Sequence, residues 1–168
     1  MIFIYSFARP IPRFFDNETF KKIGHLVDYV SLMTYDFTTL QAKPAGPNAP
    51  MGWYAQTIMQ LTSGVPESFA KKILAGLNWY GHDFVGDKST PVFGEAAIKL
   101  LEKADKIEWD ASSLEHFFTY KDEAGQDHTV YYPTVDSITD RVGFAGEVGT
   151  GVSVWELGQG LPYFYNIL

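Results

Sequence analysis

The chain contains no cysteine among its 168 residues, which excludes disulfide bonds, thiolate catalysis and sulfur-ligated metals. Basic residues are scarce: 13 Lys and Arg stand against 20 Asp and Glu, for a formal net charge of −7. Nucleic acids and anionic membranes are therefore poor partners. No apolar run reaches the ~18 residues of a membrane span. The opening residues, MIFIYSFARP, lack the basic segment of a signal peptide.

The residues that are present suit one globular domain. Hydrophobic types make up 46% of the chain and aromatic types 16%, which is enough for a substantial core. Uninterrupted apolar runs predict strands buried on both faces, as in parallel sheets, at 2–7, 29–35, 73–80 and 151–157. Capped or amphipathic stretches predict helices at 18–26, 51–61, 94–104 and 137–148, with a short helix at the end. Turn-rich segments lie at 8–12 and 42–50.

This alternation of strands and helices predicts an α/β fold with a parallel sheet. Four βα units are half of a TIM (β/α)₈ barrel, but a small doubly wound sheet also uses four parallel strands, and composition does not separate the two. Residues 115–121 and 128–132 predict a β-hairpin that turns at 123–126. We treat 1–168 as one domain, with an insertion at about 105–133.

Three of the predicted strands end in an aromatic ring beside a polar group. The ends read Met33-Thr34-Tyr35-Asp36, Asn78-Trp79-Tyr80 and Trp155-Glu156. Functional residues of parallel α/β folds gather at such ends. A sugar stacks its apolar face on a ring while its hydroxyls form hydrogen bonds, so the pattern favours a sugar site. The alternatives are a hydrogen-bonded pair without a ligand for Tyr35 and Asp36, and core filling for Trp155.

Signals for other chemistries are absent. The histidines, at positions 25, 82, 116 and 128, show no ligand spacing, so we expect no metal site. No nucleophile elbow, P-loop or dinucleotide fingerprint occurs, so we expect no cofactor. One glycosylation sequon begins at Asn17, and its use stays open. Glu115 and Glu147 are expected to be solvated surface charges.

The strand ends resemble those of glycoside hydrolase family 18, the chitinase-like family, over nearly the whole chain. Residues 29–36 resemble its sixth strand with the M-x-Y-D motif, 46–50 the loop that follows, 72–81 its seventh strand, and 151–160 its eighth. Residues 109–110, 117–120 and 128–132 resemble its small insertion. The resemblance implies a partial TIM (β/α)₈ barrel, strands five to eight, with a small β-hairpin insertion before the last helix and strand.

The resemblance also implies roles for individual residues. In this family the substrate's own acetamido group attacks the anomeric carbon, and a glutamic acid ending a D-x-x-D-x-D-x-E motif protonates the leaving oxygen. By resemblance, Tyr35 and Asp36 hold the acetamido group, Met33 lines the pocket and Trp155 stacks beneath the sugar. Asn78 and Tyr80 complete the expected substrate-binding set.

The acidic motif does not occur in this sequence, so we expect no catalytic acid in the chain. Glu156 follows the stacking tryptophan and is expected to point away from the barrel interior. We therefore interpret the chain as a binder of chitin oligosaccharides or related N-acetylglucosamine glycans. One alternative is a fragment of an active hydrolase whose acidic strand lies upstream. Another is an interaction protein with a vestigial sugar cleft.

The C-terminal sequence suggests a finer placement within the family. Residues 157–161 and 163–165 resemble the group of chitinase domain-containing proteins, with bacterial spore-cortex hydrolases as a related branch. That resemblance implies a scavenger-type receptor as a partner and a secreted or lysosomal location. The two predicted edge strands, 2–7 and 152–157, would leave a half-barrel open, and we expect self-association through these edges.

Overall fold

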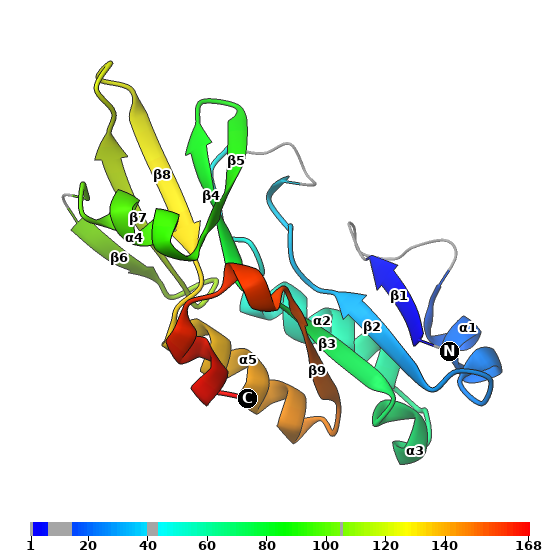
Figure 1. Cartoon of the computed structure of the whole chain (residues 1–168). Coiled ribbons are helices and arrows are strands. Elements are labelled where there is room, and N and C mark those ends of the chain that lie inside the picture. The colour runs from blue at the N-terminus through cyan, green and yellow to red at the C-terminus, as the bar shows by residue number, and fades with distance from the viewer. Residues whose placement is uncertain (1, 7–14, 40–43, 105) are drawn as a thin grey trace.

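The computed structural model of the chain describes residues 2–6, 15–39, 44–104 and 106–168. Within them, a parallel sheet has the strand order β1-β2-β3-β9, and an antiparallel sheet has the order β5-β4-β8-β7-β6 (Figure 1). The predicted α/β fold is confirmed. The turn-rich stretch 8–12 lies outside the described residues. No helix in the described part of the chain is both long and apolar enough to cross a membrane.

The parallel sheet contains the four predicted apolar runs. Its strands are β1 (Ile2–Ser6), β2 (Tyr29–Met33), β3 (Ile73–Asn78) and β9 (Gly151–Trp155). Alternate side chains of β2 face opposite sides, because successive residues of a strand point to opposite faces. Val30 and Leu32 are fully buried on one face. On the other, the Ser31 and Ser153 hydroxyls lie 2.9 Å apart across the sheet.

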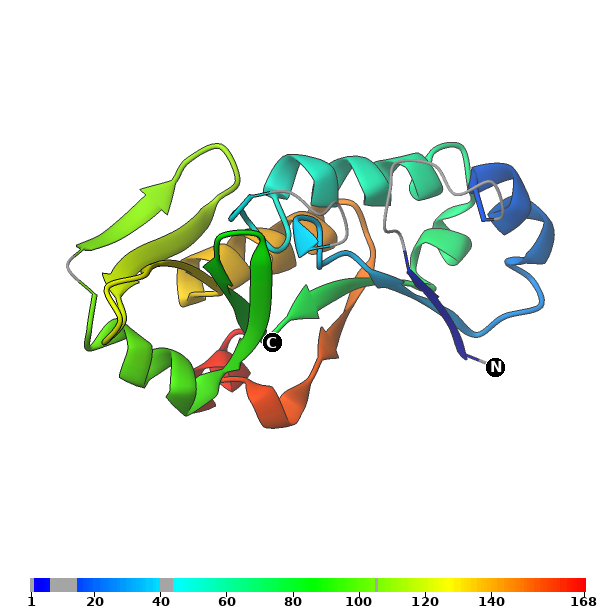
Figure 2. The same ribbon diagram turned by 90° about the horizontal axis from the view of Figure 1, so that it is seen from above.

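Helices cover the face of the parallel sheet that carries Val30 and Leu32. They are α1 (Asn17–Ile23), α2 (Met51–Thr62), α3 (Glu67–Ala70) and α5 (Val135–Glu147). Figure 2 shows α2 and α5 side by side along one side of the strands. The buried side chains of Ile58 on α2 and Ile138 on α5 join the strands in one hydrophobic core. Burial of an apolar side chain of this size contributes about 1.5–3 kcal/mol.

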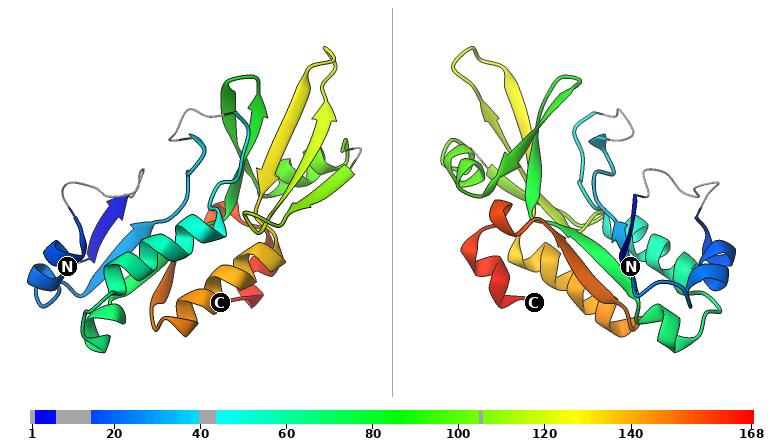
Figure 3. Two further views of the ribbon diagram at one scale, coloured as in Figure 1. Left: turned by 180° about the vertical axis from the view of Figure 1, so that it is seen from behind. Right: turned by 45° about the vertical axis from the view of Figure 1, so that its right-hand side comes forward.

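The insertion is larger than the small hairpin expected from the sequence. The expected hairpin is present as β7 (Glu115–Lys121) and β8 (Asp127–Tyr132), but it belongs to a sheet that also contains β4 (Tyr80–Val85), β5 (Lys88–Phe93) and β6 (Lys106–Asp110). The helix α4 (Gly94–Leu101) lies beside this sheet (Figure 3). The signal for the β4–β5 hairpin was the two-residue turn Gly86-Asp87, where Gly86 has a φ of 56°.

A single residue, Trp79, separates the two sheets where β3 passes into β4. Its side chain is fully buried, with its ring centroid 5.7 Å from that of Phe164. Phe164 belongs to η3 (Pro162–Asn166), which follows η2 (Leu157–Gln159) where one short terminal helix was expected. Tyr80 points to the other side, so the two rings face opposite sides of the strand. The start of β4 is thereby held at the carboxyl end of β3.

The prediction that Glu115 is a solvated surface charge is wrong. Its side chain is 5% exposed, and its Oε1 atom lies 3.2 Å from Nη2 of Arg141 on α5. The residue before it, Leu114, has a φ of 53°, and this turn directs Glu115 inward as β7 begins. Burial raises the pKa of the Glu115 carboxyl, while Arg141 and two backbone amides oppose that rise. Glu147, by contrast, is exposed as expected.

The Glu115–Arg141 pair connects three segments of the chain through hydrogen bonds: the loop before α2, the start of β7 and the middle of α5. Arg141 also donates to the carbonyl oxygens of Ser113 at 3.1 Å and Ala49 at 3.1 Å. Glu115 accepts backbone N–H groups from Asn48 at 3.0 Å and Ala49 at 2.7 Å. The loop before α2, the start of β7 and the middle of α5 therefore meet at one buried polar cluster.

Removing one partner should leave the other charge buried without compensation. We expect Glu115→Ala to lower the free energy of unfolding by about 3–5 kcal/mol, as is typical when a buried pair is broken. Glu147→Ala, the matched control on an exposed carboxylate, should change it by less than about 0.5 kcal/mol. Urea unfolding of the wild-type chain and of the two variants measures both changes in the free energy of unfolding. Equal stability of the two variants would contradict the role given to the pair.

Candidate functional site

A cleft of about 290 Å³ lies where the ends of β2 and β9 meet the beginning of the antiparallel sheet. Its lining comes from four separate parts of the sequence: Asp36, Thr39, Tyr80, His82, Pro91, Phe93, Trp155 and Gln159. Three of the residues predicted for a sugar site, Asp36, Tyr80 and Trp155, are brought together here. They are far apart in sequence, and the strand order places them side by side.

Asp36 is the best-fixed polar group of the cleft. Its Oδ1 atom accepts a hydrogen bond of 2.5 Å from the Tyr80 hydroxyl and lies 3.3 Å from Nε2 of His82. Among the described residues, none donates a hydrogen bond to its second carboxylate oxygen, so that oxygen is available to a ligand. The Asp36 side chain is 34% exposed, which keeps it accessible from the cleft.

The Tyr80 hydroxyl stays protonated at neutral pH and donates a hydrogen bond to Asp36. Burial raises the pKa of the Tyr80 hydroxyl well above its usual value, and the hydrogen bond to Asp36 raises it further. A carboxylate beside a phenol favours the protonated phenol because the phenolate would add a like charge. The pair therefore presents an oriented acceptor at the carboxylate.

The other predicted residues lie behind the cleft rather than in its lining. Tyr35 is buried, its ring contacts that of Tyr80 edge-on at 6.2 Å, and burial raises its pKa to about 12. Met33 packs against the same cluster. Asn78 donates from Nδ2 to the Tyr80 carbonyl oxygen at 2.9 Å. All three support the position of Tyr80.

Trp155 supplies the largest exposed ring of the cleft. It ends β9, and 51% of the residue is exposed. Glu156, the neighbouring carboxylate, is exposed and does not line the cleft. Asp36 is accordingly the one carboxylate among the described lining residues.

Two residues were not among those predicted from the sequence: His82, which lines the cleft, and Asn48, which lies behind it. The sequence offers His82 only as a possible metal ligand. The residue is 7% exposed, and its Nδ1 atom has no hydrogen-bond partner among the described residues. Its position two residues after Tyr80 was a usable signal, since side chains at i and i+2 of a strand share a face. Asn48 was noticed only as part of a Pro-rich loop. Its contacts depend on long-range folding and carry no local signal.

An aromatic strip extends from the cleft across the antiparallel sheet. On β4 the ring of His82 lies 5.5 Å from that of Tyr80 and 5.9 Å from that of Phe84. His82 is paired in register with Tyr131 of β8, whose ring stacks on Phe117 at 5.1 Å. Because cross-strand partners share a face, these largely buried rings lie on the same face of the antiparallel sheet, next to the cleft.

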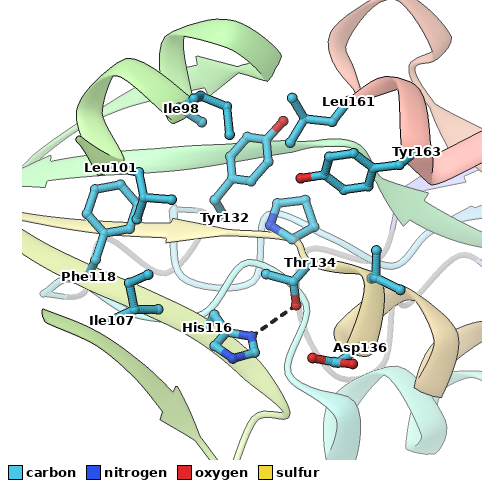
Figure 4. Close-up of a pocket in the computed structure, with 13 residues that line it drawn as sticks. Ile98, Leu101, Ile107, His116, Phe118, Tyr132, Thr134, Asp136, Leu161 and Tyr163 are labelled. Atoms are coloured by element: carbon cyan, nitrogen blue, oxygen red, sulfur yellow. Dashed lines mark hydrogen bonds between the residues drawn. The ribbon is translucent and has the colours of Figure 1, made fainter.

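A second cavity, of about 360 Å³, differs in chemistry (Figure 4). Its walls are largely aliphatic and aromatic, from α4, β6, β7 and the C-terminal segment, and include Ile98, Leu101 and Phe118. Its His116 and Thr134 side chains bond one another at 3.0 Å. Phe118 follows Phe117 in β7, so this cavity opens on the opposite face from the aromatic strip.

The site shows no arrangement for a metal ion. The described residues contain no group of three or more His, Asp or Glu side chains suited to hold one. The chemistry of the cleft is therefore that of an oriented carboxylate, a phenol, an imidazole and an exposed indole ring.

Known proteins share this arrangement of strands. The cortical fragment-lytic enzyme of Bacillus anthracis is 28% identical over 164 residues, covering 93% of this chain and 37% of the relative. The spore cortex-lytic enzyme SleL of Bacillus cereus superposes with a TM-score of 0.79 at 29% identity, over 88% of this chain and 36% of that one. A chitinase from Chromobacterium violaceum superposes with a TM-score of 0.78 at 25% identity, over 88% and 46%.

These relatives show that the chain spans about a third to a half of the lengths of the proteins it matches. The family model for glycosyl hydrolases family 18 matches residues 3–160, which is nearly the whole sequence. The chain therefore belongs to glycosyl hydrolase family 18.

Proposed function

We propose that this chain binds a glycan containing N-acetylglucosamine in the cleft of Asp36, Tyr80 and Trp155, and that it does not cleave the glycan alone. The observation that carries the proposal is the exposed Trp155 ring in one cleft with the oriented Asp36 carboxylate. The apolar face of a pyranose covers an aromatic ring, while its amide and hydroxyl donors need fixed acceptors. The unbonded oxygen of Asp36 is such an acceptor.

Names of the relatives support this class of ligand. One is called a chitinase, and others are called spore cortex-lytic enzymes. We also propose the finer placement in the group of chitinase domain-containing proteins, with a scavenger-type receptor as an alternative partner. On that alternative, substitutions in the cleft would leave receptor binding unchanged.

The carboxylates among the described residues of the cleft support the proposal that the chain alone does not hydrolyse the glycan. Family-18 chemistry needs an acid to protonate the leaving oxygen, even though the substrate supplies its own nucleophile. Among the described lining residues, Asp36 is the one carboxylate, and its Oδ1 already accepts from Tyr80. Glu156 lies outside the lining. A longer protein that contributes an acid from outside residues 1–168 is the second candidate, favoured by the 37% coverage of a lytic relative.

Trp155→Ala should weaken binding of an N-acetylglucosamine trisaccharide by about 1–3 kcal/mol, the usual loss for an aromatic stacking platform. Trp155→Phe should retain part of the affinity because a smaller ring remains. Isothermal titration calorimetry measures both values. Trp109→Ala is the matched control: this tryptophan is 39% exposed on β6, outside the cleft. An equal loss in Trp109→Ala, or none in Trp155→Ala, would refute the proposed site.

The chain by itself should release no product from chitin oligosaccharides or from spore cortex glycan. Product analysis by mass spectrometry after prolonged incubation measures this directly, with a family-18 chitinase as the positive control. Turnover by this chain that Asp36→Asn abolishes would overturn the binding-only proposal and favour the hydrolytic candidate.

We further propose that the isolated chain self-associates through its open parallel sheet. In the strand order β1-β2-β3-β9, the outer edges of β1 and β9 have no partner strand among the described residues. Unpaired edges of apolar strands template pairing with another chain.

Light scattering should give a mass of a dimer or larger for the wild-type chain. Val152→Lys, which places a charge on β9, should shift the mass toward that of a monomer. Ile98→Lys, which changes a 38% exposed apolar residue on α4, should not. A monomeric wild-type chain with a cooperative melt would contradict this proposal.

A further inference from the structure

Asn48 is buried, at 3% exposed, and does not line the cleft. Both its side-chain amide and its backbone polar groups form hydrogen bonds. Its Oδ1 atom accepts the Asp36 N–H at 2.6 Å, and its Nδ2 donates to the Tyr80 carbonyl oxygen at 3.3 Å. Its backbone N–H donates to Glu115 at 3.0 Å, and its carbonyl oxygen accepts the Phe37 N–H at 2.8 Å. One side chain thus joins the two residues whose side chains meet in the cleft.

The backbone of Asp36 shows why this contact matters. Asp36 has a φ of 64°, in the left-handed region that residues other than glycine seldom occupy. A residue held there persists only when its surroundings fix it. The Asn48 amide oxygen fixes the Asp36 N–H, and φ in turn determines where the carboxylate points.

The second hydrogen bond fixes the other half of the pair. Asn48 and Asn78 both donate to the Tyr80 carbonyl oxygen, at 3.3 Å and 2.9 Å. Tyr80 is the first residue of β4, whereas Asp36 follows the end of β2. Asn48 therefore fixes how far apart these two chain segments lie, and so whether the Tyr80 hydroxyl reaches Asp36.

Glu115 and Arg141 fix Asn48 in turn. The Glu115 carboxylate accepts the N–H groups of Asn48 and Ala49, and Arg141 donates to the Ala49 carbonyl oxygen. These hydrogen bonds fix the Pro- and Gly-rich loop at residues 44–50 to the buried Glu115–Arg141 pair. The charged pair therefore fixes the backbone from which the Asn48 amide reaches Asp36 and Tyr80.

We propose that Asn48 is a positioning residue of the glycan cleft, which sets the Asp36 carboxylate against the Tyr80 hydroxyl and transmits the support of the Glu115–Arg141 pair. This inference rests on the proposed function, because the oriented carboxylate is the group offered to the glycan. Asn48 itself does not touch the ligand.

Asn48→Ala should weaken binding of the N-acetylglucosamine trisaccharide about tenfold, or roughly 1.4 kcal/mol. Asn17→Ala is the matched control, because the Asn17 amide also donates to two backbone carbonyl oxygens, of Leu61 at 2.9 Å and Ser63 at 2.8 Å. It should lower the melting temperature but leave the dissociation constant within about twofold of wild type, since a lost hydrogen bond outside the site affects stability alone.

A second readout does not depend on sugar binding. The ¹³C signal of the Asp36 carboxyl should shift in Asn48→Ala and stay unchanged in Asn17→Ala, because only the former releases the Asp36 N–H. In the unmodified chain, the Asn48 side-chain amide signals should move on titration with the trisaccharide, while those of Asn17 should not. This measurement serves if Asn48→Ala does not fold.

The outcomes separate the two proposals. If Asp36→Ala loses sugar binding but Asn48→Ala keeps it, with an unchanged Asp36 carboxyl signal, the positioning role is overturned and the proposed function stands. If the wild-type chain binds no sugar, the proposed function fails. The carboxyl signal of Asn48→Ala then still decides whether Asn48 positions Asp36.

Discussion

Nη2 of Arg141 and Oε1 of Glu115 lie 3.2 Å apart in the interior, where α5, the start of β7 and the loop before α2 meet. Two charges removed from water are stable together only with good geometry and further hydrogen bonds. Here the pair has backbone partners on all three segments: Asn48 and Ala49 in the loop, Ser113 before β7, and Ser137 on α5. The antiparallel sheet is thereby fixed against the parallel one, and the remaining polar contacts of the cleft depend on that relation.

A chain of hydrogen bonds connects this pair to the cleft. Asn48 is held by the charged pair, Asp36 and Tyr80 are held by Asn48, and the Asp36 carboxylate is left with one oxygen for a ligand. Trp155 lies outside this chain of contacts, at the end of β9. Fixed polar groups on one side and an exposed ring on the other are the two elements that recognition of a sugar requires.

The parallel strands were predictable because each coincides with an uninterrupted apolar run, and so were the longer helices α2 and α5, whereas the four-residue helix α3 was not predicted. The meeting of Asp36, Tyr80 and Trp155 in one cleft was predictable because the carboxyl ends of parallel strands lie at the same edge of the sheet. Glu115 was not, since a lone glutamate in a strand has no local feature that distinguishes burial from exposure. The hairpin of β4 and β5 was missed because its first residues continue the apolar run of β3, so the Gly86-Asp87 turn went unused.

An aromatic ¹H–¹³C correlation spectrum, recorded during titration with the N-acetylglucosamine trisaccharide, tests the central claim most directly. If the cleft binds the glycan, the ring signals of Trp155 and Tyr80 shift with a common saturation curve, while those of Phe118 and Tyr163 in the second cavity stay in place. Shifts at Phe118 and Tyr163 with a silent Trp155 would contradict the account and move the binding site to the opposite face of the antiparallel sheet.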